Sequence, residues 1–201
     1  MSKLLLIGLL GQKRVGKDTV ADLLHKHFDF DRYTIATGIK DLATAGIDTI
    51  KKEIPWVKKE DLREFKSTLP WNGEKDVKGR KLLQSIGDWG RGQPNFWTDR
   101  LTKEIYNNLT TNWKETNRVV ITDIRLAREI TAFKKFTEEW LFGEHKLIIC
   151  KILRNTGLED QHITEEEVKK ISPLYIDIHL DNNGSLEDLE KRVLNRFWSI
   201  L

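Results

Sequence analysis

Apolar residues in this chain gather in short, nearly continuous runs that are separated by longer amphipathic stretches. Apolar runs that end at glycine or polar residues are typical of strands buried on both faces of a parallel sheet. On this basis the sequence predicts five strands, at residues 3–10, 33–36, 118–122, 145–153 and 174–180.

Helical periodicity fills most of the segments between these strands. After Gly16, apolar residues recur at the spacing of one helix face, at Val20, Leu23, Leu24 and Phe28. The same kind of pattern predicts further helices at 39–50, 81–88, 95–109, 126–140 and 186–197. Strands that alternate with helices predict an α/β fold, in which a five-stranded parallel sheet is covered on both faces as a three-layer sandwich.

Two helix starts carry a capping box, in which a hydroxyl residue is followed three positions later by an acidic residue. They are Thr164 with Glu167 and Ser185 with Asp188. Residues 55–79 fit neither periodicity, and we interpret them as an insertion of short helix and loop and not as a separate domain.

Composition limits the classes of function. The chain has 201 residues, of which 39% are hydrophobic and 32% charged, as in ordinary soluble domains. Its formal charge of +3 comes from 34 basic and 31 acidic side chains that are well mixed, which disfavours binding to a nucleic-acid polymer. The single cysteine, Cys150, is interpreted as a small buried hydrophobe. The apolar residues 1–10 are too short to span a bilayer, so a cytoplasmic location is expected.

One segment carries a chemical motif. Residues 11–17 read GQKRVGK, the G-x-x-x-x-G-K spacing of the phosphate-binding loop (P-loop), between a predicted strand and a predicted helix. Glycines let the backbone turn around an anion, and the following helix N-terminus adds positive potential. We therefore predict an ATP site formed by Gly11, Lys13, Arg14, Val15, Gly16, Lys17, Asp18 and Thr19, with the Lys17 ammonium on the β- and γ-phosphates.

The position after Lys17 departs from the usual motif. Asp18 stands where Ser or Thr would contact Mg²⁺, and Thr19 follows it. A carboxylate can hold Mg²⁺ directly or through water, and it can equally stabilise the first helical turn. Mg²⁺ is the expected cofactor, with the choice between Asp18 and Thr19 left open.

Charged residues follow two of the predicted strands. Asp123 and Arg125 come after 118–122, and Arg154 comes after 145–153. Ligands of open α/β sheets gather at the carboxyl ends of the strands. There an acid can hold Mg²⁺ and an arginine can bind phosphate. A helix-capping Asp123 and an exposed, unengaged Arg154 are the alternative interpretations.

Several motifs occur in the order known from one family. They are GQKRVGKDT at 11–19, GIKD at 38–41, LQSIGD at 83–88, DIR at 123–125 followed by Glu129, HITE at 162–165 and NGSLE at 183–187. In these motifs the chain resembles the phage-encoded deoxynucleoside monophosphate kinases, of the P-loop nucleoside monophosphate kinase superfamily. The resemblance spans nearly the whole chain, and within it an aspartate at position 18 is expected.

The resemblance implies transfer of the γ-phosphate of ATP to a deoxynucleoside 5′-monophosphate (dNMP). It implies that four residues act in catalysis, namely Lys17, Asp123, Arg125 and Arg154. Asp18 and Asp123 would hold the metal. The candidate acceptor-binding residues are Lys40, Asp41, Gln84, Asp88, Arg91, Trp97, Arg128 and Glu129. A solvated helix surface is the alternative interpretation for Lys40, Arg128 and Glu129, and a place in the core is the alternative for Trp97. Trp89 is a further candidate for stacking on a base, as is Trp97.

The resemblance also implies how the chain is organised. We expect one kinase domain over residues 1–201, with an acceptor-binding insertion at about 37–110 and a lid at about 155–172 that closes over the phosphates. His162 within the lid is interpreted as structural. The expected partners are ATP and a dNMP, with no membrane and no nucleic-acid polymer, and a homodimer is left open.

Two other functions stay open. One is a related P-loop kinase that acts on another phosphorylated acceptor, such as phosphomevalonate or dephospho-coenzyme A. The other is a nucleotide-dependent switch or binding module, because a P-loop alone does not define a reaction. The sequence lacks the threonine switch and the N-K-x-D block expected of GTPases, which disfavours the switch.

Overall fold

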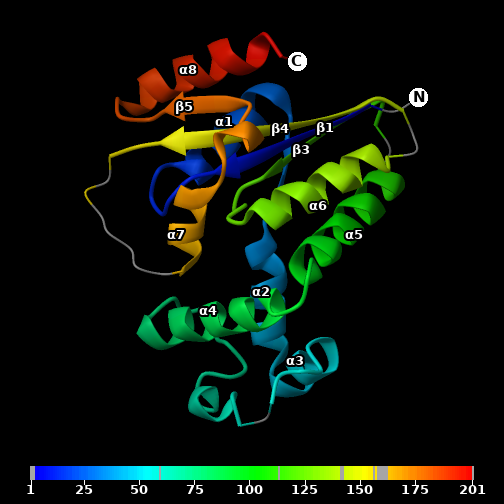
Figure 1. Cartoon of the computed structure of the whole chain (residues 1–201), viewed down its shortest axis with the longest axis vertical. Coiled ribbons are helices and arrows are strands. Elements are labelled where there is room, and N and C mark those ends of the chain that lie inside the picture. Colours follow the sequence, from blue (N-terminus) through cyan, green and yellow to red (C-terminus); the bar gives the residue numbers. More distant parts are fainter. Residues whose placement is uncertain are drawn as a thin grey trace. The chain divides into compact units, whose positions relative to one another are not determined.

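The computed structural model describes residues 3–58, 60–112, 114–140, 143–155, 157 and 163–200, without the side chains of residues 163–165. These residues form two compact units (Figure 1). Unit 1 consists of Met1–Thr34 and Thr102–Leu201, and unit 2 consists of Ile35–Leu101. One boundary between the units therefore lies inside helix α5 (Phe96–Thr111).

Unit 1 is built on a five-stranded parallel sheet. Its strands lie in the order β2-β3-β1-β4-β5, with bounds Asp31–Tyr33, Thr116–Ile121, Lys3–Leu10, His145–Leu153 and Ile178–Asp181. In the register of the sheet, Gly8 lies beside Ile121 of β3 and Leu10 lies beside Lys151 of β4. Because β1 is the central strand, the chain leaves it between the carboxyl ends of β3 and β4.

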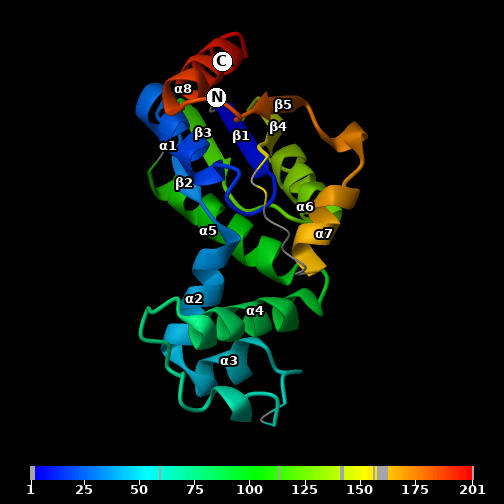
Figure 2. The ribbon, with the colours of Figure 1, turned by 90° about the vertical axis from the view of Figure 1, so that its left-hand side faces the viewer.

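Helices cover both faces of this sheet. Helices α1 (Lys17–Phe28) and α8 (Leu186–Trp198) lie on one face, whereas α6 (Ala127–Glu138) and α7 (Ile163–Lys170) lie on the other (Figure 2). Val20 of α1 and Val193 of α8 are fully buried in one cluster with Ile7 of β1. The predicted α/β fold with three layers and five parallel strands is confirmed.

Unit 2 is helical. It contains α2 (Ile35–Ala45), α3 (Ile47–Glu53), the 3₁₀ turn η1 (Arg63–Phe65), α4 (Val77–Arg91) and the first residues of α5. Its buried side chains include Leu42, Ile50, Leu62, Leu82 and Ile86. An ion pair between Arg100 and Glu53 joins α5 to α3. The unit overlaps most of the predicted insertion at 37–110.

Two expected elements near the start of unit 2 are wrong. The strand expected at 33–36 ends at Tyr33, and Ile35 begins α2 instead. The helix expected at 39–50 is interrupted at Gly46, whose φ of 89° is left-handed and separates α2 from α3. A glycine adopts this conformation without the steric cost that other residues meet, so it allows the chain to end one helix and begin the next.

The strand expected at 174–180 is also wrong in its first half. Residues Pro173–Tyr175 form the 3₁₀ turn η2, and β5 begins only at Ile178. The Ser172 hydroxyl accepts a hydrogen bond from the Leu174 N–H at 3.3 Å, which starts the turn. Leu174 is 96% exposed, so its apolar side chain gave a false signal of a buried strand.

One of the two capping boxes is confirmed. The Ser185 hydroxyl accepts from the Asp188 N–H at 3.1 Å, and the Asp188 carboxylate accepts from the Ser185 N–H at 3.0 Å. Helix α7 begins at Ile163, one residue before Thr164, and the Thr164 side chain lies outside the described ones, so the second capping box stays a prediction. His162 lies outside the described residues.

Cys150 is fully buried in β4, as predicted. Desolvation raises the pKa of its thiol to about 12, so the group is a neutral thiol at neutral pH. Within the described part of the chain, no helix combines the length and the apolar content that a bilayer crossing requires.

Candidate functional site

The P-loop occupies the connection between β1 and α1. Within it, Gly11, Arg14 and Gly16 have φ angles of 147°, 64° and 99°. Left-handed residues in a loop that opens a helix are the geometry in which backbone N–H groups converge on an anion. A Cβ atom on Gly11 would lie 2.7 Å from Val15 Cγ2 and 2.8 Å from the Ile152 carbonyl oxygen. Glycine is therefore required there by space as well as by conformation.

The Lys17 side chain folds back over this loop. Its ammonium nitrogen donates hydrogen bonds to the carbonyl oxygens of Gly11 and Gln12, each at 2.7 Å. These contacts place a full positive charge over the first half of the loop, beside the N-terminus of α1. The role of Lys17 in binding phosphates stays a prediction, for which this position of the ammonium group is suitable.

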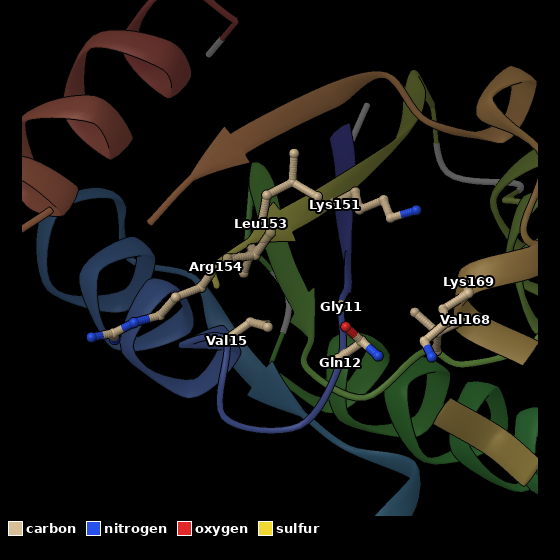
Figure 3. A pocket seen from close by; sticks show the side chains of 9 residues that line it. Gly11, Gln12, Val15, Lys151, Leu153, Arg154, Val168 and Lys169 are labelled. Atoms are coloured by element: carbon tan, nitrogen blue, oxygen red, sulfur yellow. The ribbon is translucent and has the colours of Figure 1, made fainter. Parts of the chain in front are cut away.

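A pocket of about 270 Å³ opens beside the loop (Figure 3). Its walls come from the P-loop, the end of β4 and helix α7, and comprise Gly11, Gln12, Val15, Lys151, Ile152, Leu153, Arg154, Val168 and Lys169. Three of the lining residues are cationic, which suits a polyanionic ligand.

The three cations of the pocket differ in their arrangement. Lys169 of α7 binds the Glu166 carboxylate at 2.7 Å, so part of its charge is already compensated. Lys151 projects from β4 on the side of α7, whereas Arg154 extends away from Val168 and Lys169 toward α1 (Figure 3). The predicted phosphate-binding residue Arg154 thus lines the pocket at the edge that faces α1.

One polar residue of this site was not found by sequence reasoning. Asn182 follows β5 and is only 4% exposed. Its side-chain nitrogen donates to the Val15 carbonyl oxygen at 2.7 Å, and its backbone N–H donates to the Leu153 carbonyl oxygen at 2.7 Å. The available signal was its place two residues after a predicted strand, where the functional residues of α/β sheets gather.

Asp18 is directed toward the second strand. Its carboxylate lies 3.2 Å from the Arg32 guanidinium, and Arg32 also pairs with Asp22 one helical turn further along α1. The Asp18 side chain remains 84% exposed. Sequence reasoning did not find Arg32, although two acids four residues apart on a helix can share one cation.

Asp123 and Arg125 flank a buried anchor. Ile124 between them is fully buried and lies so close to β1 that a Cβ atom on Gly8 would be 2.5 Å from its Cδ1. Because β3 ends at Ile121 beside β1, this anchor brings Asp123 and Arg125 to the same edge of the sheet as the P-loop. Their predicted clustering with the loop agrees with this topology.

The structure gives Glu129 a role different from the predicted contact with the acceptor. Glu129 is 4% exposed, and its carboxylate accepts from the backbone N–H groups of Arg125 at 2.8 Å and Leu126 at 3.0 Å. It therefore caps α6 and holds the backbone that carries Arg125. Arg128, one position earlier, is exposed.

The remaining predicted residues lie on two packed helices of unit 2. Lys40 and Asp41 are on α2, and Gln84, Asp88 and Arg91 are on α4. A Cβ atom on Gly87 would be 3.2 Å from Ile39 Cδ1, so α2 and α4 pack closely beside these residues. Arg91 lies 3.5 Å from Asp88, and the latter side chain is half exposed.

The structure decides between the two interpretations of Trp97 in favour of the core, so its place among the acceptor-binding residues is wrong. It is only 4% exposed, and its indole N–H donates to the Gly87 carbonyl oxygen at 2.9 Å. A Cβ atom on Gly90 would be 2.3 Å from the same indole. Trp97 therefore belongs to the core of unit 2 and does not offer a free face for a nucleobase. Trp89 is half-buried, and its backbone carbonyl accepts from the Trp56 indole N–H at 2.9 Å.

Comparisons with known proteins match the segment that contains the P-loop. Residues 5–68 match the family model for deoxynucleotide monophosphate kinases, and this stretch contains the whole P-loop and helix α2. No curated protein sequence matches the chain.

Two solved structures share the fold. TT1252 from Thermus thermophilus has 18% sequence identity and a TM-score of 0.55, over 100% of this chain and 99% of that protein. The dephospho-CoA kinase from Campylobacter jejuni has 14% identity and a TM-score of 0.53, over 98% of this chain and 97% of that enzyme. These structures show that the chain has the fold of P-loop kinases, and residues 5–68, which contain the P-loop, resemble the deoxynucleotide monophosphate kinases.

Proposed function

We propose that this kinase transfers the γ-phosphate of ATP to a deoxynucleoside 5′-monophosphate and so forms a deoxynucleoside diphosphate and ADP. The observation that carries the proposal is the family match over residues 5–68, which covers both the P-loop and the segment with Lys40 and Asp41. A donor site and a candidate acceptor segment thus occur in one matched stretch.

The donor side rests on the P-loop and its pocket. Phosphoryl transfer depends mainly on positioning and on neutralising charge that spreads over the phosphate oxygens. Lys17 supplies one cation from within the loop, and Arg154 supplies another from the end of β4. Arg125 follows β3 at the same edge of the sheet and is proposed to bind the transferred group.

We propose Mg²⁺ as the cofactor that accompanies ATP. Among the described residues, no group of three or more His, Cys, Asp or Glu side chains could hold a metal ion by itself. Mg²⁺ in kinases needs no such cage, because substrate phosphates, water and one or two carboxylates complete its shell. Asp123 fits this role. Asp18 instead contacts Arg32 of β2, which favours Asp123 as the metal-binding carboxylate.

When bound, the metal ion neutralises phosphate charge. The protein contributes orientation, because Ile124 anchors the segment and Glu129 caps the helix that follows. For the acceptor we propose Lys40, Asp41, Gln84, Asp88 and Arg91 of unit 2, together with Arg128.

A coupled assay that measures ADP formation tests the proposal. ATP is held constant while each of the four dNMPs, the matching ribonucleotides and dephospho-coenzyme A is supplied as acceptor. We expect ADP formation that depends on at least one dNMP. Turnover with dephospho-coenzyme A alone would assign the chain to the alternative small-molecule kinase. If ATP binds and no dNMP supports turnover, the proposal is wrong.

A further inference from the structure

We propose that Asn182 is a positioning residue for the P-loop, and that its side-chain amide sets the direction of the Gly16 N–H group. Nothing in the family resemblance assigns a role to this position. The inference rests on the proposed function in one respect only, namely that the phosphates of ATP bind in the P-loop.

Asn182 joins two walls of the pocket. Its side chain holds Val15 of the P-loop and its backbone N–H holds Leu153 of β4, each through a carbonyl oxygen at 2.7 Å. Both Val15 and Leu153 line the pocket. Asn182 therefore helps to set the distance between the P-loop and the end of β4.

The turn that carries Asn182 is itself held in place. The Arg192 guanidinium donates to the Asp181 carbonyl oxygen at 2.8 Å and to its carboxylate at 2.5 Å. The Asn183 side-chain oxygen accepts from the Asn155 N–H at 2.7 Å. Because hydrogen bonds hold both neighbours of Asn182, its backbone is restrained where its side chain donates to Val15.

The contact has a consequence for phosphate binding. Val15 and Gly16 share one peptide unit, which is planar and trans, so that its C=O and N–H bonds point in opposite directions. When Asn182 holds the Val15 carbonyl oxygen, the Gly16 N–H must point away from Asn182. Backbone N–H groups at this place in a P-loop are the donors that cradle phosphates.

Lys17 and Asn182 hold different halves of the loop. Lys17 contacts the carbonyls of Gly11 and Gln12 in the first half, whereas Asn182 contacts Val15 in the second. The Asn182 amide is neutral, so it orients the loop and leaves the charge interaction with the phosphates to Lys17. A Cβ atom on Gly16 would lie 2.4 Å from the Asn182 nitrogen, so the amide also fills the space behind the glycine.

Two variants test the inference, with ATP affinity measured calorimetrically in the absence of an acceptor. N182A removes the donor, and N182D keeps the shape but places a carboxylate against the Val15 carbonyl. Without this donor the Val15–Gly16 peptide is no longer held in one orientation, and fixing it costs part of the binding free energy. We therefore expect ATP binding to weaken by about tenfold in N182A, and by more in N182D, whose carboxylate repels the Val15 carbonyl.

Asn117 supplies a matched control. It is 1% exposed, and its side-chain nitrogen donates to the Lys114 carbonyl oxygen at 3.3 Å, at the amino end of β3. N117A therefore removes a comparable buried amide away from the P-loop. We expect N117A to lower the melting temperature while its ATP affinity stays within twofold of the wild type.

The outcomes separate a positioning role from a purely structural one. An N182A or N182D protein that unfolds cooperatively and binds ATP within twofold of the wild type would overturn the inference. So would loss of folding in both variants, since Asn182 would then serve stability alone. The test needs no acceptor, so failure of every dNMP in the turnover assay leaves it intact. A wild-type protein that does not bind ATP would instead refute the proposed function.

Discussion

The guanidinium of Arg32 lies 3.2 Å from the carboxylate of Asp18, the residue that directly follows the P-loop lysine. Arg32 also pairs with Asp22, so a single cation from β2 is shared between two acids of α1. This arrangement directs Asp18 toward β2 and distinguishes it from Asp123, which lies at the edge of the sheet next to the P-loop. The two carboxylates should therefore differ in their effect on metal use.

Substituting the two acids should reveal that difference. We expect D123N to raise the Mg²⁺ concentration needed for half-maximal turnover by about tenfold, because it removes a carboxylate proposed to hold the ion. D18N should change this concentration by less than about threefold, since Arg32 engages Asp18 and the position is exposed. Titrating Mg²⁺ at saturating ATP makes the comparison, and a larger effect of D18N would reverse the assignment.

Removing the Lys17 ammonium should abolish turnover. We expect K17A to lower kcat by about a hundredfold or more, because the loop loses the cation that neutralises phosphate charge in the transition state. K26A is a suitable control, since Lys26 lies in the last turn of the same helix and pairs with Glu190 at 2.8 Å. Circular dichroism should show that both variants are folded. Wild-type rates in K17A would mean that the loop is not the donor site.

Glycine substitutions should separate the cost of backbone conformation from the cost of crowding. A Cβ atom on Gly11 would overlap Val15 and the Ile152 carbonyl, whereas one on Gly73, whose φ is 95°, would meet nothing within 4 Å. We expect G73A to lower the free energy of unfolding by about 1 kcal/mol, the cost of a left-handed alanine. G11A should lower the free energy of unfolding by at least a further 1–2 kcal/mol, about the cost of overpacking a core, and should also weaken ATP binding. Urea denaturation measures the free energy of unfolding of both variants, and equal losses would argue against crowding at Gly11.

The buried thiol of Cys150 should resist chemical modification. Its pKa of about 12 lies above the value of an unfolded thiol, so the folded protein holds the proton when the unfolded chain has released it. The thiol therefore contributes its full stabilisation below the unfolded pKa, and this is lost as pH rises toward 12. At pH 8 we expect a disulfide reagent to label Cys150 only as fast as the protein unfolds. Labelling within seconds in native buffer would contradict its burial.

Local patterns in the sequence were sufficient for the central part of unit 1. The continuous apolar runs of β1 and β4 and the amphipathic α1 give a clear signal because each depends only on neighbouring residues. The P-loop is equally local, since its glycines and Lys17 act within one turn of chain. Local patterns also explain the wrong start of the last predicted strand. Leu174 is exposed on a turn, but its local sequence pattern is the same as that of a buried apolar residue.

The sequence by itself therefore determined the α/β fold, the P-loop and the kinase resemblance. The tertiary structure alone decided which polar side chains are engaged and how. Asn182 reaches Val15 across 167 positions of the chain because β4 lies beside β1 and β5 lies beside β4, an order that periodicity does not encode. Likewise, Trp97 is buried against Gly87 and Gly90 of α4. Contacts between distant segments depend on how elements pack, and that is settled only when the whole chain has folded.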